Sequence, residues 1–212
     1  MANDHNIIQW NCRGLRINYD EIGILIAKYS PAVICLQETR LTPDLSPTFK
    51  NYVCYYESKI NASHGLGVLV KKTIPQSRIK IVSPLEVIAV NVTIQGKTYV
   101  ISNHYVSPSQ RPTKIEFNRV INEFKFPFLL CGDFNGHNPI WSHNESVQID
   151  DRGRVIEQIM NDHSLILLNT TVKTRFQANC LPSLLDLTLA HPLIYLDLNY
   201  TMEVIIIRLS FP

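Results

Sequence analysis

The chain consists largely of apolar runs of strand length, and several of these runs end directly on a polar residue. Apolar runs of roughly four to eight residues, bounded by turn residues, are typical of strands buried in a sheet. Amphipathic segments of helical length interrupt these runs. Helices that connect strands of a sheet pack on its faces. The pattern therefore predicts an α/β domain of mixed, mostly antiparallel sheets that face each other, with helices outside.

The expected strands include one clear hairpin. Glu86–Ile94 alternates between apolar and polar residues, and Gln95-Gly96 is expected to turn the chain back into Lys97–Ser102. The other expected strands share a mostly apolar sequence and are Ile7–Trp10, Ala32–Leu36, Tyr52–Tyr56, Leu66–Val70, Phe128–Cys131, Leu165–Leu168, Leu185–Leu189 and the segment from Asp197 onward that includes Val204–Ile207.

Three segments are expected to be helical. Asn18 to Tyr29 places apolar residues on one face, and Asn18 with Glu21 matches a capping box. Thr113 with Glu116 gives the same signal at the start of a second helix. The third helix is expected over Asp151 to Asp162.

Composition is typical of one globular domain. The 212 residues are 45% hydrophobic and 18% charged, and we interpret residues 1–212 as a single domain. The net charge of +2 permits contact with nucleic acid but does not argue for it. No apolar run approaches membrane-spanning length, no signal peptide is recognised, and no feature indicates an obligate protein partner. Five scattered cysteines indicate reduced thiols in an intracellular protein.

Polar residues at strand ends are the candidates for chemistry, because a sheet-based site collects its groups there. Each of them also has an ordinary structural interpretation. Asn11 could be a turn residue, Glu38 a solvated charge, and Tyr105 a core aromatic with an exposed hydroxyl. Asp186 stands among leucines, where an acid needs a partner or a metal. Taken singly, each structural interpretation outweighs the functional one.

The segment GDFNGHN at 132–138 is more specific. In an extended backbone, Asp133 and Asn135 face one side and Phe134 faces the other. Gly132 and Gly136 allow close approach of the backbone. An acid and an amide that face one point can accept a proton from water and orient that water, as a hydrolase requires.

Hydrolysis of a phosphodiester also requires that charge on the phosphoryl oxygens is neutralised. A hard divalent cation held by carboxylate oxygen does this, and Glu38 is the best candidate ligand. Asn11, Tyr105 and a histidine would supply hydrogen bonds to the phosphate.

In this order, the motifs resemble the endonuclease/exonuclease/phosphatase superfamily. Within it, the chain is most similar to the apurinic-like endonuclease domain of jockey-like non-LTR retrotransposons, over about residues 6–192. The motifs that carry the resemblance are QWNCRG at 9–14, LQET at 36–39, HGLGVLVKK at 64–72, NHYVSP at 103–108, GDFNGHNPIW at 132–141, DDRGRVIEQIMNDHSLILLNT at 150–170, KTRF at 173–176 and LLDLTL at 184–189.

The resemblance implies a four-layer α/β sandwich and a role for each matching residue. Glu38, with Asn11 beside it, would bind Mg²⁺ or Mn²⁺, and Tyr105 would contact the scissile phosphate. Asp133 would activate the attacking water, and Asn135 would orient it. Further roles fall to Asp186, which would pair with a C-terminal histidine, to Thr174 on the DNA-binding face, and to Arg13 and Arg40 as basic candidates for DNA contact.

The implied reaction is a nick in one DNA strand that leaves a 3′-hydroxyl to prime reverse transcription, which places the protein in the nucleus. Domains of this kind end on a strand followed by Ser-Asp-His, and that tripeptide does not occur in this chain, whose last residues are RLSFP. We therefore expect a C-terminally truncated domain that lacks the final strand and motif, with impaired activity. The alternatives are a catalytically dead remnant that binds nucleic acid and a phosphatase or lipid phosphodiesterase of the same superfamily.

Overall fold

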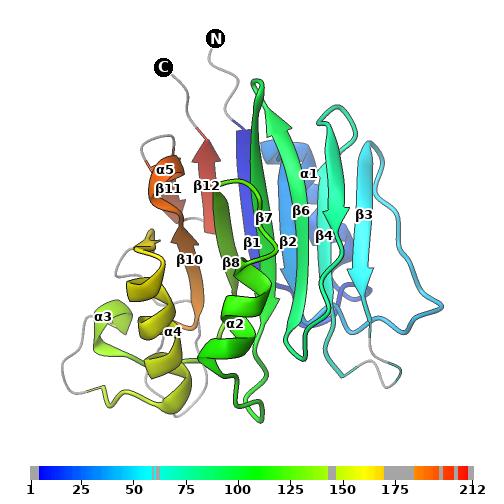
Figure 1. The fold of residues 1–212 in the computed structure, drawn as a ribbon. Coiled ribbons are helices and arrows are strands. Elements are labelled where there is room, and N and C mark those ends of the chain that lie inside the picture. The colour runs from blue at the N-terminus through cyan, green and yellow to red at the C-terminus, as the bar shows by residue number, and fades with distance from the viewer. Residues whose placement is uncertain are drawn as a thin grey trace.

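Two six-stranded sheets lie face to face in the computed structural model, with helices on both outer surfaces (Figure 1). The structure describes residues 5–58, 60, 63–142, 147–169 and 184–195, and the backbone of residues 198–202 and 205–209. Helix α1 (Tyr19–Tyr29) covers one sheet, and α2 (Lys114–Ile121) and α4 (Asp151–Asp162) cover the other. The predicted four-layer α/β sandwich of two mixed sheets with helices outside is confirmed.

The first sheet has the order β11-β12-β1-β2-β4-β3. Strands β1 and β2 are parallel, and every other neighbouring pair in this sheet is antiparallel. The bounds are β1 His5–Asn11, β2 Val33–Gln37, β3 Tyr52–Glu57, β4 Leu66–Lys71, β11 Leu198–Met202 and β12 Ile205–Leu209.

The second sheet has the order β5-β6-β7-β8-β10-β9. It also contains one parallel pair, β7 with β8. Each sheet therefore has two parallel strands whose carboxyl ends meet at one edge. The bounds are β5 Gln76–Ile79, β6 Glu86–Ile94, β7 Lys97–Tyr105, β8 Phe128–Asp133, β9 Ile166–Leu167 and β10 Asp186–Ala190.

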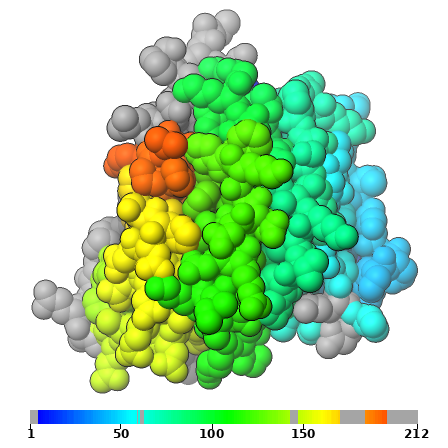
Figure 2. Space-filling view, viewed as in Figure 1, coloured from blue at the N-terminus to red at the C-terminus, as the bar shows by residue number. Residues whose placement is uncertain are grey.

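Helices α2 and α4 lie side by side and cover the near face of the second sheet (Figure 2). Lys114 and Asp162 form an ion pair of 2.6 Å between these helices. The capping box predicted at Thr113 and Glu116 is confirmed, with hydrogen bonds in both directions. The sequence analysis missed β5 and two four-residue helices, α3 (Pro139–Ser142) and α5 (Pro192–Tyr195), because such short elements leave little periodicity to detect.

The capping box predicted at Asn18 and Glu21 is wrong. The Asn18 side chain makes no capping bond with α1. Its Nδ2 instead donates to the carbonyl oxygens of Cys12 at 2.6 Å and of Gly14 at 3.3 Å. An asparagine amide nitrogen can only donate, so these two carbonyls turn the amide away from the helical N–H groups. Asn18 thereby fixes the loop that follows β1.

Three apolar layers hold the sandwich together. The central one lies between the sheets and contains Ile7 and Val33 from the first sheet and Val90, Ile101 and Leu129 from the second. A second layer packs α2 and α4 against the second sheet, and a third packs α1 against the first. Burial of this kind is the dominant favourable term in folding.

The apolar run at 205–207 does not lie at an open edge of the sheet. Strand β12 pairs with β1 on one side and with β11 on the other, so Ile205–Ile207 is enclosed by hydrogen-bonded neighbours. Pairing on both sides removes the aggregation hazard that an unpaired edge strand would carry. No helix in the described part of the chain is long and apolar enough to cross a membrane.

His104 provides a test of the packing between β7 and α2. It is only 1% exposed, its ring stacks on Phe134, and burial lowers its pKa from 6.5 to about 3. The unfolded chain takes up a proton first as the pH falls, so the stability due to the neutral ring is lost below about pH 6.5. Between about pH 7 and pH 5 we expect the free energy of unfolding to fall by roughly 2 kcal/mol because of this residue.

Urea unfolding at a series of pH values measures this loss. His104→Phe keeps an aromatic ring in the core but removes the titrating group, so its stability should depend less on pH over the same range. Equal pH dependence in the two proteins would show that His104 is not held neutral by burial.

Candidate active site

Five polar side chains meet at the edge of the sandwich where the parallel strands end. Asn11 ends β1, Glu38 directly follows β2, Tyr105 ends β7 and Asp133 ends β8. Asp186 begins the antiparallel strand β10 and pairs in register with Asp133. The prediction that these strand-end residues gather in one place is confirmed.

The amide of Asn11 joins the two sheets. Its Nδ2 donates to Glu38 Oε1 on the first sheet and to Asp133 Oδ2 on the second, each at 2.9 Å. The backbone N–H of Arg13 donates to Asn11 Oδ1 at 3.2 Å. Because Oδ1 accepts this bond, the nitrogen of the amide is the atom presented to the two carboxylates.

Glu38 is an ionised carboxylate with three hydrogen-bond donors around it. Burial alone would raise its pKa, but hydrogen bonds from Asn11 and Arg40, together with the charge of Arg40, outweigh burial and lower the pKa. Arg40 forms an ion pair of 2.6 Å with Oε2, and the hydroxyl of Tyr105 donates to Oε1 at 3.3 Å. A charged carboxylate oxygen is the ligand type that a hard cation prefers.

Tyr105 is held as a neutral phenol. Burial raises its pKa, and the nearby negative charges of Glu38 and Asp133 raise it further. The hydroxyl therefore keeps its proton at neutral pH and acts as a hydrogen-bond donor. This is the state required to contact a phosphate oxygen.

Asn135 is fixed by backbone geometry as well as by hydrogen bonds. Its N–H donates to Asp133 Oδ1 at 3.1 Å, and its Nδ2 donates to the carbonyl oxygen of Val106 at 3.0 Å. Phe134 packs into the apolar layer beneath α2, as predicted. The extended backbone assumed at Asn135 is wrong, because its φ of 47° lies in the left-handed region. The turn brings the Asn135 N–H back to Asp133.

Positive φ angles concentrate around these side chains. Of the eight non-glycine residues with positive φ in the described part of the chain, four lie at the site, namely Arg13, Glu38, Arg40 and Asn135. Such conformations cost on the order of 1 kcal/mol or more each and persist only where the surroundings enforce them. The loops that carry the site are therefore held in specific conformations rather than in relaxed ones.

Asp186 is positioned by a neighbouring asparagine. The side chain of Asn169 donates to the carbonyl oxygen of Asp186 at 2.8 Å and accepts from the N–H of Thr188 at 2.6 Å. These bonds fix the start of β10 beside Asp133. Asn169 lies in the LLNT segment, which the sequence analysis quoted without giving it a role.

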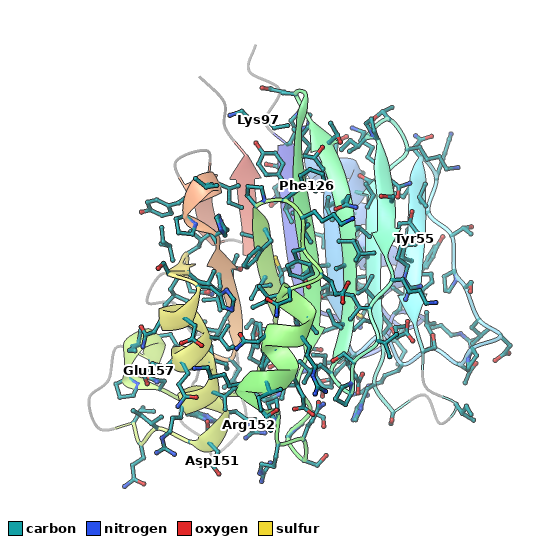
Figure 3. The ribbon with its side chains drawn as sticks, in the orientation of Figure 1. Tyr55, Lys97, Phe126, Asp151, Arg152 and Glu157 are labelled. Carbon is teal, nitrogen blue, oxygen red and sulfur yellow. The ribbon has the colours of Figure 1, made fainter. Side chains whose placement is uncertain are left out.

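The DRGR segment holds the site loops against α4. Asp150 caps the helix through the N–H of Gly153 at 2.6 Å and accepts from the N–H of His137 at 3.1 Å. Arg152 Nη1 donates to the carbonyl oxygen of Pro108 at 2.8 Å, in the loop that follows Tyr105. In Figure 3, Asp151 and Arg152 lie at the end of the molecule opposite Lys97, where β7 begins.

Glycines allow the backbone segments around the site to approach one another closely. A β-carbon at position 132 would lie 2.2 Å from the carbonyl oxygen of His104, and one at position 136 would lie 3.0 Å from the nitrogen of Gly153. A β-carbon at position 153 would lie 2.0 Å from the carbonyl oxygen of His137. The predicted close backbone approach at Gly132 and Gly136 is confirmed.

The remaining predicted residues lie in different environments. Arg13 is exposed, and Arg40 is half-exposed while paired to Glu38. Thr174 lies outside the described residues. Two histidines of the quoted motifs have other surroundings: His104 is in the core, and His137 pairs with Asp150 at 3.2 Å.

Sequence reasoning missed Glu86 and His64. Glu86 begins β6 opposite Tyr105, in the same cross-strand row as Asp133 and Asp186, and His64 Nδ1 lies 3.0 Å from its Oε1. The sequence could have indicated Glu86, because an antiparallel strand begins at the edge where the neighbouring parallel strands end, and Glu86 is the first residue of such a strand.

The donor set fits a hard divalent cation. Glu38 and Asp133 bring carboxylate oxygens to the same amide nitrogen, so two negative charges converge there. Across the described residues, no three His, Cys, Asp or Glu side chains form a complete metal cage. Mg²⁺ commonly uses one or two carboxylates and completes its shell with water and substrate phosphate, so this set is sufficient for it.

Comparison with known proteins agrees with the fold. The family described as endonuclease-reverse transcriptase matches residues 99–204, half of the chain, and the chain belongs to this family. It is 23% identical over 205 residues to the probable RNA-directed DNA polymerase from transposon X-element of Drosophila melanogaster. That match covers 93% of this chain but 22% of the relative, so the chain spans about a fifth of the relative's length.

Solved structures share the fold. The endonuclease domain of TRAS1, a telomere-specific non-LTR retrotransposon, superposes with a TM-score of 0.76 at 15% identity, over 97% of this chain and 98% of that one. A 3′ phosphatase from Neisseria, bound to a product DNA hairpin, gives a TM-score of 0.70 at 15% identity, over 98% and 99%. The resemblance to retrotransposon domains of the endonuclease/exonuclease/phosphatase superfamily is confirmed.

The contact between Gly153 and His137 predicts a large effect of one methyl group. Gly153→Ala places a β-carbon against backbone, which cannot move aside without displacing the site loop. We expect the free energy of unfolding to fall by about 1–3 kcal/mol. Chemical denaturation measures the change.

Gly23→Ala is the matched control. Gly23 lies in α1 with nothing within 4 Å of the added β-carbon, so alanine should stabilise the helix. The expected gain is about 0.5–1 kcal/mol. Similar effects of the two substitutions would contradict the steric explanation.

Proposed function

We propose that this domain is a divalent-metal-dependent endonuclease that nicks one strand of DNA. The observation that carries the proposal is the Asn11 amide, which holds Glu38 and Asp133 from different sheets at 2.9 Å each. If Asn11 served only to stabilise the fold, a hydrogen bond to one of these two carboxylates would be enough. Two converging carboxylates that share one donor are costly without a cation, because like charges repel in a partly buried site.

Glu38 would hold Mg²⁺ or Mn²⁺, with Asn11 beside it. The cation would neutralise charge on the phosphoryl oxygens. Asp133 would take a proton from the attacking water, and Asn135 would orient that water from its fixed turn. Tyr105, which keeps its proton, would donate a hydrogen bond to the scissile phosphate. The oxygen of water would bond to phosphorus as the bond to the 3′-oxygen breaks, and the leaving 3′-oxygen would take up a proton from solvent, which leaves a 3′-hydroxyl and a 5′-phosphate.

DNA is the substrate that the family and its relatives favour. The Neisseria structure holds a DNA product, and the X-element and TRAS1 relatives belong to mobile elements. A nick with a free 3′-hydroxyl could prime reverse transcription by a polymerase, and such a reaction would take place in the nucleus. The exposed Arg13 would contact the strand, whereas Arg40 would serve mainly to fix Glu38.

Nicking of supercoiled plasmid tests the proposal. We expect Mg²⁺-dependent conversion to the open circle, no conversion in EDTA, and a loss of at least about 10³-fold in rate for Asp133→Ala, because the general base is gone. Asp162→Ala is the matched control, since Asp162 ends α4 and pairs with Lys114 away from the site.

Three other outcomes would be informative. Nicking that survives Asp133→Ala would overturn the assignment of the site. Salt-dependent DNA binding without nicking by the folded protein would instead identify a catalytically dead remnant that binds nucleic acid. Turnover of lipid or inositol phosphates without nicking would identify a phosphatase or lipid phosphodiesterase.

Glu38→Gln tests the metal ligand separately. Glutamine keeps the shape and an oxygen that accepts from Asn11, but it removes the charge and, with it, the ion pair to Arg40. We expect the Mg²⁺ concentration for half-maximal nicking to rise by about tenfold or more, in keeping with the loss of a charged oxygen ligand. A titration of rate against Mg²⁺ measures this shift, and an unchanged midpoint with a lower maximum rate would contradict the role of Glu38 as a ligand.

A further inference from the structure

A histidine and a buried acid adjoin the site without a role in the chemistry above. Glu86, the first residue of β6, extends the row formed by Tyr105, Asp133 and Asp186 across the second sheet. Side chains of one cross-strand row point to the same face of a sheet. Glu86 therefore faces the site from the side of Tyr105, and its side chain is only 9% exposed.

His64 is fixed next to Glu86 by its backbone. Its carbonyl oxygen accepts from the N–H of Arg40 at 2.7 Å, and the carbonyl oxygen of Gly65 accepts from the N–H of Thr39 at 3.0 Å. Both donors directly follow Glu38. The segment that carries His64 is thus paired with the loop that carries the proposed metal ligand.

Gly65 makes this approach possible. Its φ is 103°, a conformation that favours glycine, and an added β-carbon would lie 2.7 Å from Thr39 Oγ1 and 3.1 Å from the carbonyl oxygen of Glu57. A side chain at position 65 would therefore be strained and would crowd Thr39, next to the loop with which His64 is paired.

The ring of His64 is held in one orientation. Its Nδ1 lies 3.0 Å from Glu86 Oε1, and its centroid lies 5.3 Å from that of the Tyr105 ring. A carboxylate oxygen accepts hydrogen bonds, so Nδ1 carries a hydrogen. Nε2 is then the ring nitrogen left for a substrate, and it donates to a phosphate oxygen in the imidazolium form, which carries a hydrogen on both nitrogens. The side chain is 30% exposed.

An anionic substrate needs such a group at this place. The described acids at the site are Glu38, Asp133, Asp186 and Glu86, while the amide of Asn11 and the side chain of Arg40 are already bonded to carboxylates. A DNA strand that approaches this edge meets mostly negative charge, which repels its phosphates. Hydrogen-bond donors to the phosphates offset this repulsion. His64 is such a donor on the side of Tyr105.

We propose that His64, oriented by Glu86, binds a non-bridging oxygen of a phosphate that flanks the scissile one. This inference rests on the proposed function, since it requires DNA at the site. A histidine that merely closed the edge of the sheet would contribute to stability but would not respond to the charge of any single phosphate.

Methylphosphonate substitution tests the contact. Nick sites are mapped on a duplex with the wild-type protein, and each phosphate around one site is then replaced in turn by an uncharged methylphosphonate. We expect one flanking position to slow wild-type nicking by about 10–100-fold, the range of a charge-assisted hydrogen bond. On unmodified DNA, His64→Ala should nick more slowly than the wild type by a similar factor. A methylphosphonate at the sensitive position should then slow this variant little further.

Glu86→Gln provides a second variant if His64→Ala does not fold. It keeps an oxygen that accepts from Nδ1 but removes the charge that orients and polarises the ring, so it should show a weaker form of the same pattern. His163→Ala is the matched control, because this imidazole bonds to Asn118 at 2.8 Å between α2 and α4. His163→Ala should be slowed by the flanking methylphosphonate as much as the wild type is.

The outcomes separate this inference from the function on which it rests. If the wild type nicks and His64→Ala shows the same loss as the wild type at every methylphosphonate, the contact is disproved and the endonuclease stands. If the wild type binds the duplex without nicking it, the affinities of both proteins for the methylphosphonate duplexes are compared instead of the nicking rates, and the same criterion applies. A wild type that neither binds nor nicks DNA would overturn both proposals.

Discussion

The structure depends on an amide that bridges two sheets at their common edge. Asn11 reaches from the first sheet to Asp133 on the second, so the site exists only when both sheets are packed together. The apolar layer between the sheets is non-directional and does not by itself set their relative position to within a hydrogen bond. Hydrogen bonds across the sheets add this directional restraint, among them those of Asn11, that of Gln37 to Asn103 at 2.6 Å, and that of Thr188 to Gln9 at 3.2 Å.

Much of the architecture could be predicted from the sequence because strands and helices here carry strong local signals. The first hairpin strand, Glu86–Ile94, and the helix Asp151–Asp162 have the predicted bounds, whereas the second hairpin strand runs to Tyr105 instead of Ser102. The strand-end rule also identified Asn11, Glu38, Tyr105 and Asp133. That rule works because parallel strands must end at the same edge, whatever their distance along the chain.

The parts that could not be predicted are those decided by tertiary contacts. The capping box at Asn18 failed because two carbonyls in the preceding loop compete for its amide. The turn at Asn135 is held by Asp133 and Val106, which no local pattern reveals. Glu86 was missed because only strand ends were considered, and its partner His64 lies in a loop whose place is set by Thr39 and Arg40.

The register of β1 with β12 has a consequence for handling the domain. His5 pairs with Leu209, whereas Asn11 lies at the other end of β1, about 20 Å away at the usual rise per strand residue. The two outermost described strand ends therefore lie at the end of the sandwich remote from the candidate site (Figure 1). A label, a surface anchor or a fused module attached beyond either of these strand ends would leave the edge that carries the candidate site exposed. Immobilising the domain through this face would orient every molecule with its site outward.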